Sequence, residues 1–114
     1  MSDCIFCKIA NKEIPSKVIY EDSTILVFED VEPQAPVHVL LIPKKHIPSL
    51  NHIEEGMVEV VSHIFVKIPY LAEQLGVQDT GYRIIANCGE DGGQSVGHLH
   101  YHLLGGRALT WPPG

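Results

Sequence analysis

The sequence predicts an α+β domain over residues 1–114, with an antiparallel sheet of about five strands, one long helix and a short N-terminal helix. Four short runs are rich in β-branched and aromatic residues, and a fifth alternates histidine with apolar residues; both patterns are typical of strands. One longer segment repeats its apolar residues every three or four positions, as expected for a helix with one buried face. Because three runs precede this segment and two follow it, the order favours antiparallel strands in an α+β domain.

Local patterns place each predicted element along the chain. In chain order we expect a short helix at residues 4–11, strands at 18–20, 25–28 and 37–42, a long helix at 53–75, and strands at 82–86 and 98–104. Turn-forming residues at 21–23 join the first two strands into a hairpin. Pro33 and Pro36 remove backbone donors and indicate a loop after the hairpin. The next run is almost entirely apolar, which predicts a central strand, and it carries His38.

The long helix contains a proline within its apolar pattern. Pro69 is expected to kink or break the helix near residues 65–66, because it removes a backbone donor and clashes with the preceding turn. Gly76 is expected to cap the C-terminus of the helix. His52 and His63 lie near or on this helix, where we expect them to face solvent.

Composition argues against several classes of partner. The net charge is −6 and the sequence has no stripe of Lys and Arg, so nucleic acid is not expected as a partner. Apolar runs fall short of the roughly 20 residues of a membrane span, and the polar start at residues 1–4 does not resemble a secretory signal. The three cysteines fit a reducing compartment better than a disulfide framework. We therefore expect a cytoplasmic protein without a membrane partner.

Residues 98–104 carry three histidines, at alternate positions. Side chains of a strand point alternately to opposite faces, so His98, His100 and His102 are expected on one face and the intervening apolar residues on the other. Histidine titrates near neutrality and can take and give protons. The Gly-rich loop at residues 87–97 offers backbone that could closely approach a phosphate. Loop and strand together indicate chemistry on a phosphate, with histidine as nucleophile or proton carrier.

Two other interpretations of the histidine segment stay open. A His-x-His pair on a strand can present two imidazoles to a catalytic zinc ion, although the strand has no companion carboxylate and the glycine loop favours an anion. The histidines could also be packed polar groups without a chemical role, although polar residues seldom occupy a packed face in such number.

Several separated motifs resemble the histidine triad (HIT) superfamily. The string His98-x-His100-x-His102, followed by two apolar residues, resembles the signature of that family. Segments that resemble its Hint branch, the nucleoside phosphoramidases, lie at residues 13–15, 33–38, 42–47, 92–96, 104–107 and 111–114. The resemblance extends over nearly the whole chain. It implies the HIT fold and a homodimer in which the sheets of two subunits join.

The resemblance implies a catalytic residue set. His100 would attack phosphorus and form a nucleotidyl-histidine that water then cleaves. His102 would contact the phosphate oxygens and share in proton transfer, and His38 would complete the cluster of imidazoles. Ser95 and Asn87 would donate hydrogen bonds to the phosphate or to the leaving nitrogen. Without the resemblance, Ser95 and Asn87 would be ordinary turn residues.

The resemblance also implies a purine nucleotide site. Asp30 would hold the ribose, because a carboxylate can accept hydrogen bonds from two adjacent hydroxyl groups; its alternative role is that of a turn residue. The other implied nucleotide-binding residues are Ile5, Phe6, Ile9, Phe28, Val31, Gln94 and Val96. The apolar residues among them could equally belong to the core. Such a slot is not expected to distinguish adenine strongly from guanine.

The implied activity is hydrolysis of purine nucleoside 5′-phosphoramidates to a nucleoside monophosphate and an amine. AMP, GMP and their phosphoramidates are therefore the expected ligands. Hydrolysis of dinucleoside polyphosphates is one alternative, because other HIT branches act on those substrates. A purine-nucleotide-binding or scaffold module with vestigial turnover is the other.

Cys4 and Cys7 have the C-x₂-C spacing of half a zinc site. HIT-like proteins with this spacing tend to bind a structural zinc ion, and the resemblance implies His46 and His98 as the other two ligands. The alternative is a pair of small, buried cysteines that pack as apolar residues. Cys88 lies in the glycine loop and is expected to be incidental.

The C-terminal residues 108–114 lack an apolar period of their own, and Pro112-Pro113 favours an extended tail. Trp111 has a large apolar ring, which a neighbouring subunit could bury. We therefore expect the tail to help select substrates near the partner's active site. A loose, exposed Trp111 is the alternative, since chain ends are commonly mobile.

Overall fold

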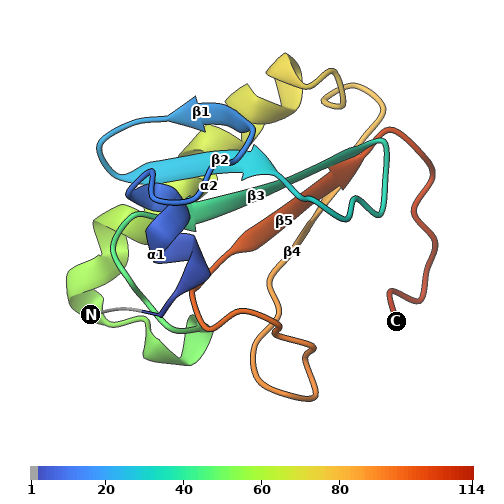
Figure 1. Ribbon diagram of the computed structural model, residues 1–114. Coiled ribbons are helices and arrows are strands. Elements are labelled where there is room, and N and C mark those ends of the chain that lie inside the picture. The colour runs from blue at the N-terminus through green and yellow to red at the C-terminus, as the bar shows by residue number, and fades with distance from the viewer. Residues whose placement is uncertain (1–2) are drawn as a thin grey trace.

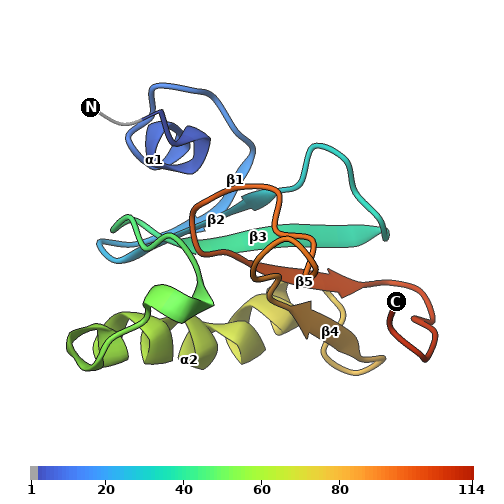
Figure 2. The ribbon, with the colours of Figure 1, turned by 90° about the horizontal axis from the view of Figure 1, so that it is seen from below.

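Five antiparallel strands form one sheet with a helix on each face, as the computed structural model shows for residues 3–114 (Figures 1 and 2). The strands lie in the order β1-β2-β3-β5-β4. Their bounds are β1 Val18–Glu21, β2 Ile25–Glu29, β3 Val37–Pro43, β4 Tyr82–Ile85 and β5 Tyr101–Gly105. The helices are α1 Ile5–Ala10 and α2 Val58–Gln74, with 3₁₀ turns η1 Leu50–His52 and η2 Glu55–Met57 before α2. The predicted α+β class and order of elements are confirmed.

The face of the sheet toward α2 carries the larger core. Ile64, Ile68 and Leu71 recur along one side of α2 and are buried against the apolar residues of β2, β3 and β5. Full burial of such a side chain contributes about 1.5–3 kcal/mol, so this face supplies much of the stability of the fold. None of the predicted catalytic residues belongs to this core among the described residues.

The face toward α1 carries a smaller core next to the histidines. Phe6 and Ile9 of α1 pack on Phe28 of β2 and on Leu40 and Ile42 of β3. Figure 2 shows α1 on the opposite side of the sheet from α2. The short helix therefore covers only part of this face.

The long helix differs from its prediction at its start and at Pro69. Residues 53–57 lie before α2, mostly in a 3₁₀ turn, and the helix begins at Val58. The predicted break is wrong, because α2 continues through Pro69 to Gln74. A proline removes one helical donor, and the buried side chains on either side of Pro69 hold the helix against the sheet.

The predicted C-terminal cap of α2 is confirmed. Gly76 has a φ of +76°, a conformation that glycine adopts without steric cost. The N–H of Gly76 donates to the carbonyl of Glu73 at 3.1 Å, and that of Val77 to the carbonyl of Ala72 at 2.9 Å. These two bonds form a Schellman motif, which satisfies carbonyls at the end of the helix.

The strand that was predicted to carry the three histidines also differs from its prediction. β5 begins at Tyr101, so His98 and His100 precede the strand instead of lying in it. The backbone there pairs with the loop after β3, where the Leu99 N–H donates to the Ile47 carbonyl at 2.6 Å. The alternation of faces nevertheless persists. Leu99 and Tyr101 pack in the core under α2, while His98 and His100 contact Phe6 of α1.

His52 and His63, which were both predicted to face solvent, differ in exposure. His52 is exposed as predicted, and its Nδ1 lies 2.8 Å from the Ser49 hydroxyl. His63 is only partly exposed, which corrects its prediction, because its Nε2 lies 2.6 Å from Asp22 Oδ2 in the turn between β1 and β2. This contact ties α2 to the first hairpin. Over the described residues, α2 and the shorter helices are not long and apolar enough to cross a membrane.

Candidate active site and metal centre

A cavity of about 670 Å³ lies between α1 and the sheet. Its walls come from α1, β2 and β3, and its polar end comes from the loop before β5 and from β5 itself. The predicted residues that line it are Ile5, Phe6, Ile9, Phe28, Asp30, Val31, Ser95, Val96, His100 and His102. An apolar slot with a few polar groups at one end is typical of a site for a small organic ligand.

His100 is held in one tautomer at the polar end of the cavity. Only 4% of its surface is exposed, and its Nδ1 lies 2.7 Å from the backbone carbonyl of His98. A carbonyl oxygen can only accept, so Nδ1 carries the proton and donates it to this bond. In the neutral ring, Nε2 then keeps an unshared electron pair. This is the form of imidazole that can attack an electrophile.

His102 and His38 form a second pair with fixed proton positions. His38 Nδ1 accepts from the backbone N–H of Gln34 at 3.0 Å, so neutral His38 carries its proton on Nε2. That nitrogen lies 2.9 Å from His102 Nδ1 and 3.3 Å from Asp30 Oδ2. If it donates to His102, the proton of neutral His102 is on Nε2. His102 is then a hydrogen-bond donor in the cavity.

Burial favours the neutral form of both histidines in this pair. The pKa of His102 is lowered to about 4, mainly by burial and also by the neighbouring His100 and His38, while Asp30 opposes the shift. Burial also lowers the pKa of His38, with Asp30 opposing the shift. Asp30, His38 and His102 lie close enough to hold a cation, but the Gln34 N–H on Nδ1 of His38 leaves its Nε2 protonated. The arrangement therefore suits hydrogen bonding better than catalytic metal binding.

Two predicted nucleotide-binding residues lie outside the cavity and shape the glycine loop. Asn87 Nδ2 donates to the Gly92 carbonyl at 2.7 Å. Gln94 Nε2 donates to the carbonyls of Pro48 and Val96 at 2.8 and 3.0 Å. These bonds hold the loop that presents Ser95 and Val96 to the cavity. In this structure, Asn87 and Gln94 position the site without lining it.

Sequence reasoning missed part of the cavity wall. The additional lining residues are Ile14, Pro15, Ser16, Lys17, Glu29, Pro33 and Leu40. Leu40 follows His38 by two positions on β3, so strand alternation could have placed it on the same face. Residues 14–17 lie in a loop before β1 and carry no periodic signal. The end of this loop is held beside β2, where the Glu29 N–H donates to the Lys17 carbonyl at 3.0 Å.

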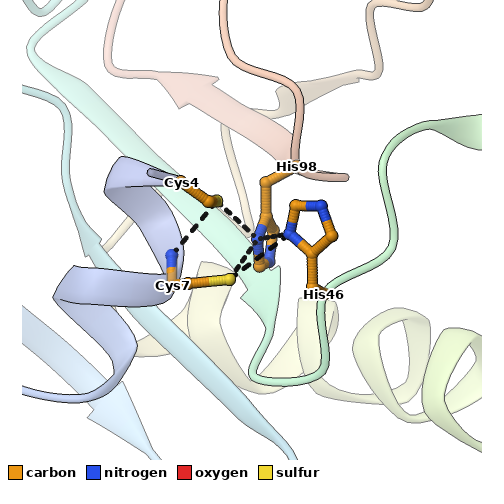
Figure 3. Close-up of side chains that lie close together, drawn as sticks. All are labelled: Cys4, Cys7, His46 and His98. Atoms are coloured by element: carbon orange, nitrogen blue, oxygen red, sulfur yellow. Dashed lines mark hydrogen bonds between the residues drawn. The ribbon is translucent and has the colours of Figure 1, made fainter. Parts of the chain in front are cut away.

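The four predicted metal ligands come together beside α1 (Figure 3). Cys4 Sγ and His46 Nδ1 each lie 3.2 Å from His98 Nδ1, and Cys7 Sγ lies 3.3 Å from His46 Nδ1. All four ligand atoms lie within 4.8 Å of one another. Tetrahedral bonds of about 2.3 Å to sulfur and 2.0–2.1 Å to nitrogen place ligand atoms about 3.3–3.8 Å apart, so the geometry fits zinc.

A backbone carbonyl prepares His98 for this cluster. Its Nε2 lies 2.8 Å from the Pro43 carbonyl and must donate to it, which leaves Nδ1 with the unshared pair that a metal requires. Burial is the main reason why the pKa of His98 is lowered. Four protein ligands leave no coordination position for water in a tetrahedral site, so the metal would be structural. It would tie α1 to the segment that carries His98.

α1 connects the metal cluster to the cavity. Cys4 caps the helix, since its Sγ accepts from the Cys7 N–H at 3.3 Å. The ring of Phe6 lies edge-on to both histidines, 5.9 Å from His98 and 5.1 Å from His100 between centroids. Holding α1 in place therefore also holds one wall of the cavity.

Comparisons with known proteins agree with this geometry. The model of a protein family described as "Scavenger mRNA decapping enzyme C-term binding" matches residues 3–109. A HIT-like protein from Synechocystis sp. is 48% identical over 112 residues, which are 98% of this chain and 97% of that protein. The chain belongs to the histidine triad family. The resemblance of residues 98–102 to the family signature is thus confirmed at the level of the superfamily.

Solved histidine triad structures share the whole fold. A HIT family hydrolase from Legionella pneumophila superposes with a TM-score of 0.96 at 49% identity, over 98% of this chain and 100% of that one. A histidine triad protein from Clostridium difficile gives a TM-score of 0.93 at 54% identity, over 96% of each chain.

A 14 kDa zinc-binding protein from Zea mays is 48% identical to this chain over 115 residues, which are 99% of this chain and 89% of the maize protein.

Proposed function

We propose that this histidine triad protein hydrolyses purine nucleoside 5′-phosphoramidates through a nucleotidyl-histidine on His100. The observation that carries the proposal is the bond from His100 Nδ1 to the His98 carbonyl, which leaves Nε2 as a nucleophile beside the cavity. The Legionella pneumophila relative is called a hydrolase, which supports the reaction class. The Gly-Gly-Arg at 105–107 and the Trp-Pro-Pro-Gly at 111–114 resemble the phosphoramidase branch.

The first step exchanges one P–N bond for another. His100 Nε2 attacks phosphorus, and the bond from phosphorus to the amine breaks with its electron pair on the leaving nitrogen. The leaving nitrogen takes a proton, for which the His102 Nε2–H and the Ser95 hydroxyl are the cavity-lining donors. Hydrogen bonds from the same groups to the phosphate oxygens would stabilise charge that develops in the transition state.

The second step releases the nucleotide. Water attacks phosphorus and gives a proton back to the group that protonated the leaving nitrogen, His102 Nε2 or the Ser95 oxygen, while the P–Nε2 bond breaks and its electron pair returns to His100. The products are a nucleoside monophosphate and the amine. His38 would hold His102 in the required tautomer, because its Nε2 lies 2.9 Å from His102 Nδ1.

The remaining cavity residues would bind the nucleoside. Asp30 lines the cavity, with Oδ2 3.3 Å from His38 Nε2, and would accept hydrogen bonds from the ribose hydroxyl groups. The base would lie against the side chains of Ile5, Phe6 and Ile9 on α1 and that of Phe28 on β2, with Val31 at the edge. AMP, GMP and their phosphoramidates are the ligands that suit such a slot.

We also propose a structural zinc ion, a homodimer and a cytoplasmic location. Zinc is supported by the fit of Cys4, Cys7, His46 and His98 and by the name of the maize relative. A dimer is supported by large apolar side chains exposed along α2, namely Val58, Phe65, Val66 and Tyr70. Cysteines in a metal cluster instead of a disulfide framework favour a reducing compartment.

One experiment separates this function from its alternatives. Purified protein is given adenosine 5′-phosphoramidate, diadenosine polyphosphates and AMP side by side, and products and nucleotide binding are measured. Faster turnover of the phosphoramidate, together with a mass increase of one nucleotidyl group on His100 after rapid quench, supports the proposal. Faster turnover of the dinucleotides would indicate the other hydrolase class. Binding of AMP without turnover would indicate a binding module.

A further inference from the structure

The loop between β2 and β3, residues 30–36, contacts the histidine pair through its backbone. The N–H of Gln34 donates to His38 Nδ1 at 3.0 Å. On the other side of this ring, Nε2 lies 2.9 Å from His102 Nδ1 and 3.3 Å from Asp30 Oδ2. The position of one backbone N–H in a surface loop therefore affects where two imidazoles carry their protons.

A neutral pair of imidazoles joined in this way has two proton arrangements. In the first, His38 donates from Nε2 to His102 Nδ1, so His102 presents an N–H from Nε2. In the second, His102 donates from Nδ1 to His38 Nε2, and the His38 proton moves to Nδ1. That proton would then point at the Gln34 N–H, with donor against donor. Gln34 thereby selects the first arrangement, and Asp30 supports it by accepting from His38 Nε2.

The guanidinium of Arg107 holds Gln34 in place from the turn after β5. Its Nη2 and Nε donate to the Gln34 carbonyl at 3.0 and 3.3 Å. The preceding Gly106 has a φ of +91°, and a Cβ at this position would lie 2.9 Å from Pro36 Cβ, so the turn packs closely on the loop. Within the described part of the chain, Arg107 supplies the hydrogen bonds that join residues 31–36 to the chain beyond β3.

We propose that Arg107 is a positioning residue for His102 and acts through the Gln34 N–H. By holding this N–H on His38 Nδ1, Arg107 keeps the His102 proton on Nε2. The inference rests on the proposed function, in which this Nε2–H serves the leaving nitrogen or the phosphate. Arg107 itself does not line the cavity, so its effect reaches the substrate only through the loop and the histidine pair.

The effect on turnover should be modest, because Arg107 and Gln34 are exposed and Asp30 favours the same proton arrangement. Arg107→Met keeps much of the length of the side chain and removes its donors. It should lower kcat for adenosine 5′-phosphoramidate about five-fold, as expected for loss of one exposed hydrogen bond. AMP affinity should change less than about two-fold, since the Asp30 N–H is held separately by the His38 carbonyl at 3.1 Å.

NMR spectroscopy measures the proton positions directly. Long-range proton–nitrogen correlations distinguish protonated from unprotonated ring nitrogens, and the unmodified protein should show His38 and His102 protonated on Nε2. In Arg107→Met, both rings should shift toward protonation on Nδ1. Arg83→Met is the matched control, because Arg83 donates to carbonyls of the C-terminal tail, and it should leave both rings unchanged. Identical ring signals in Arg107→Met and the unmodified protein would overturn the inference.

A double-mutant cycle tests whether Arg107 acts through His38. In a His38→Ala background, Arg107→Met should lower kcat less than about two-fold, because the pair that it orders is no longer present. A similar loss of kcat in both backgrounds would mean that Arg107 acts by another route, and the inference would be wrong.

The NMR measurement separates this inference from the proposed function. If the proton positions shift in Arg107→Met and no phosphoramidate is hydrolysed by the unmodified protein, the proposed reaction fails and the positioning of His102 stands. If the unmodified protein hydrolyses the phosphoramidate, and Arg107→Met changes neither the proton positions nor kcat, the reaction stands and the positioning role fails.

Discussion

The metal cluster contains His98 and the cavity contains His100, two residues further along the chain. Each ring donates a hydrogen bond to a backbone carbonyl, but from the opposite ring nitrogen. His98 donates from Nε2 to the Pro43 carbonyl, which turns an unprotonated Nδ1 toward Cys4, Cys7 and His46. His100, two residues later, donates from Nδ1 to the His98 carbonyl, which leaves Nε2 unprotonated beside the cavity. A single backbone acceptor decides which nitrogen keeps its electron pair. The geometry thereby suits identical side chains to the two different roles proposed for them.

Of the predicted substitutions, that of His100, the proposed nucleophile, should have the largest effect on turnover. His100→Asn should lower kcat by at least about a thousand-fold, because loss of a covalent nucleophile cannot be offset by binding contacts. Nucleotide affinity should change only a few-fold, since the apolar slot and Asp30 are intact. Steady-state hydrolysis and AMP titration measure the two quantities. A variant that retains a tenth of kcat, a cost of about 1.4 kcal/mol, would show that the covalent role is wrong.

The matched variant of this experiment is His52→Asn. His52 is exposed and lines a different surface from His100. It should retain full turnover. A similar loss in both variants would mean that the effect is not specific to the cavity.

The metal cluster should show the opposite pattern, with a large effect on stability and a small one on turnover. Cys4→Ser removes a ligand, and the domain should lose about 3 kcal/mol, which lowers Tm by roughly 10–20 °C. Elemental analysis of protein purified without chelator should give about one zinc ion per chain, and far less in the variant. At a temperature where the variant is folded, kcat should fall less than about ten-fold, because His100 keeps its carbonyl partner.

Cys88→Ser supplies the control for the metal experiment, since Cys88 lies in the glycine loop outside the cluster. It should keep both its metal and its Tm. Less than about a tenth of an equivalent of zinc in the unmodified protein would contradict the site, because structural sites of this kind rarely lose their metal without unfolding.

Acid should destabilise the fold through the histidine pair. The pKa of His102 is about 4 in the folded protein and about 6.5 in an unfolded chain, so the unfolded state binds protons first as the pH falls. The free energy of unfolding should therefore decrease between pH 6.5 and 4, by on the order of 1 kcal/mol for this partly exposed group. Urea titrations across this range measure the slope. His102→Gln should flatten it, and an unchanged slope would contradict the assignment.

How far the sequence predicts the molecule differs between its parts. Periodicity identified α2 and the strands because burial on one face of an element leaves a repeating pattern. The prediction that Pro69 breaks the helix was wrong, because the loss of one hydrogen bond is small compared with the packing of Ile64, Ile68 and Leu71. Spacing alone identified Cys4 and Cys7, while their partner histidines came from the family resemblance.

The functional roles were harder to predict than the elements. The tautomers of His98 and His100 depend on carbonyls brought near by the loop after β3 and by the chain itself, which no residue pattern encodes. Lys17 and Glu29 border the cavity where the backbone before β1 pairs with the end of β2, and no residue pattern indicates this pairing. Asn87 and Gln94 resemble ligand-binding residues in sequence but stabilise the loop in this structure.

The smallest predicted effect concerns the C-terminal tail. Arg83 on β4 donates from Nη2 to the Thr110 carbonyl at 2.8 Å, and its guanidinium lies 5.9 Å from the Trp111 ring centroid. Trp111 is 80% exposed in one subunit, so a partner subunit could still bury most of its ring. Deleting residues 108–114 should therefore alter the ranking of leaving amines several-fold while nucleotide affinity hardly changes, because the tail follows β5 and the proposed nucleoside site lies under α1. Trp111→Ala should reproduce most of the change if the ring carries the selectivity. Equal kcat/KM profiles across several phosphoramidates for the full and shortened chains, or a monomer in sedimentation at micromolar concentration, would contradict a role for the tail at a neighbouring site.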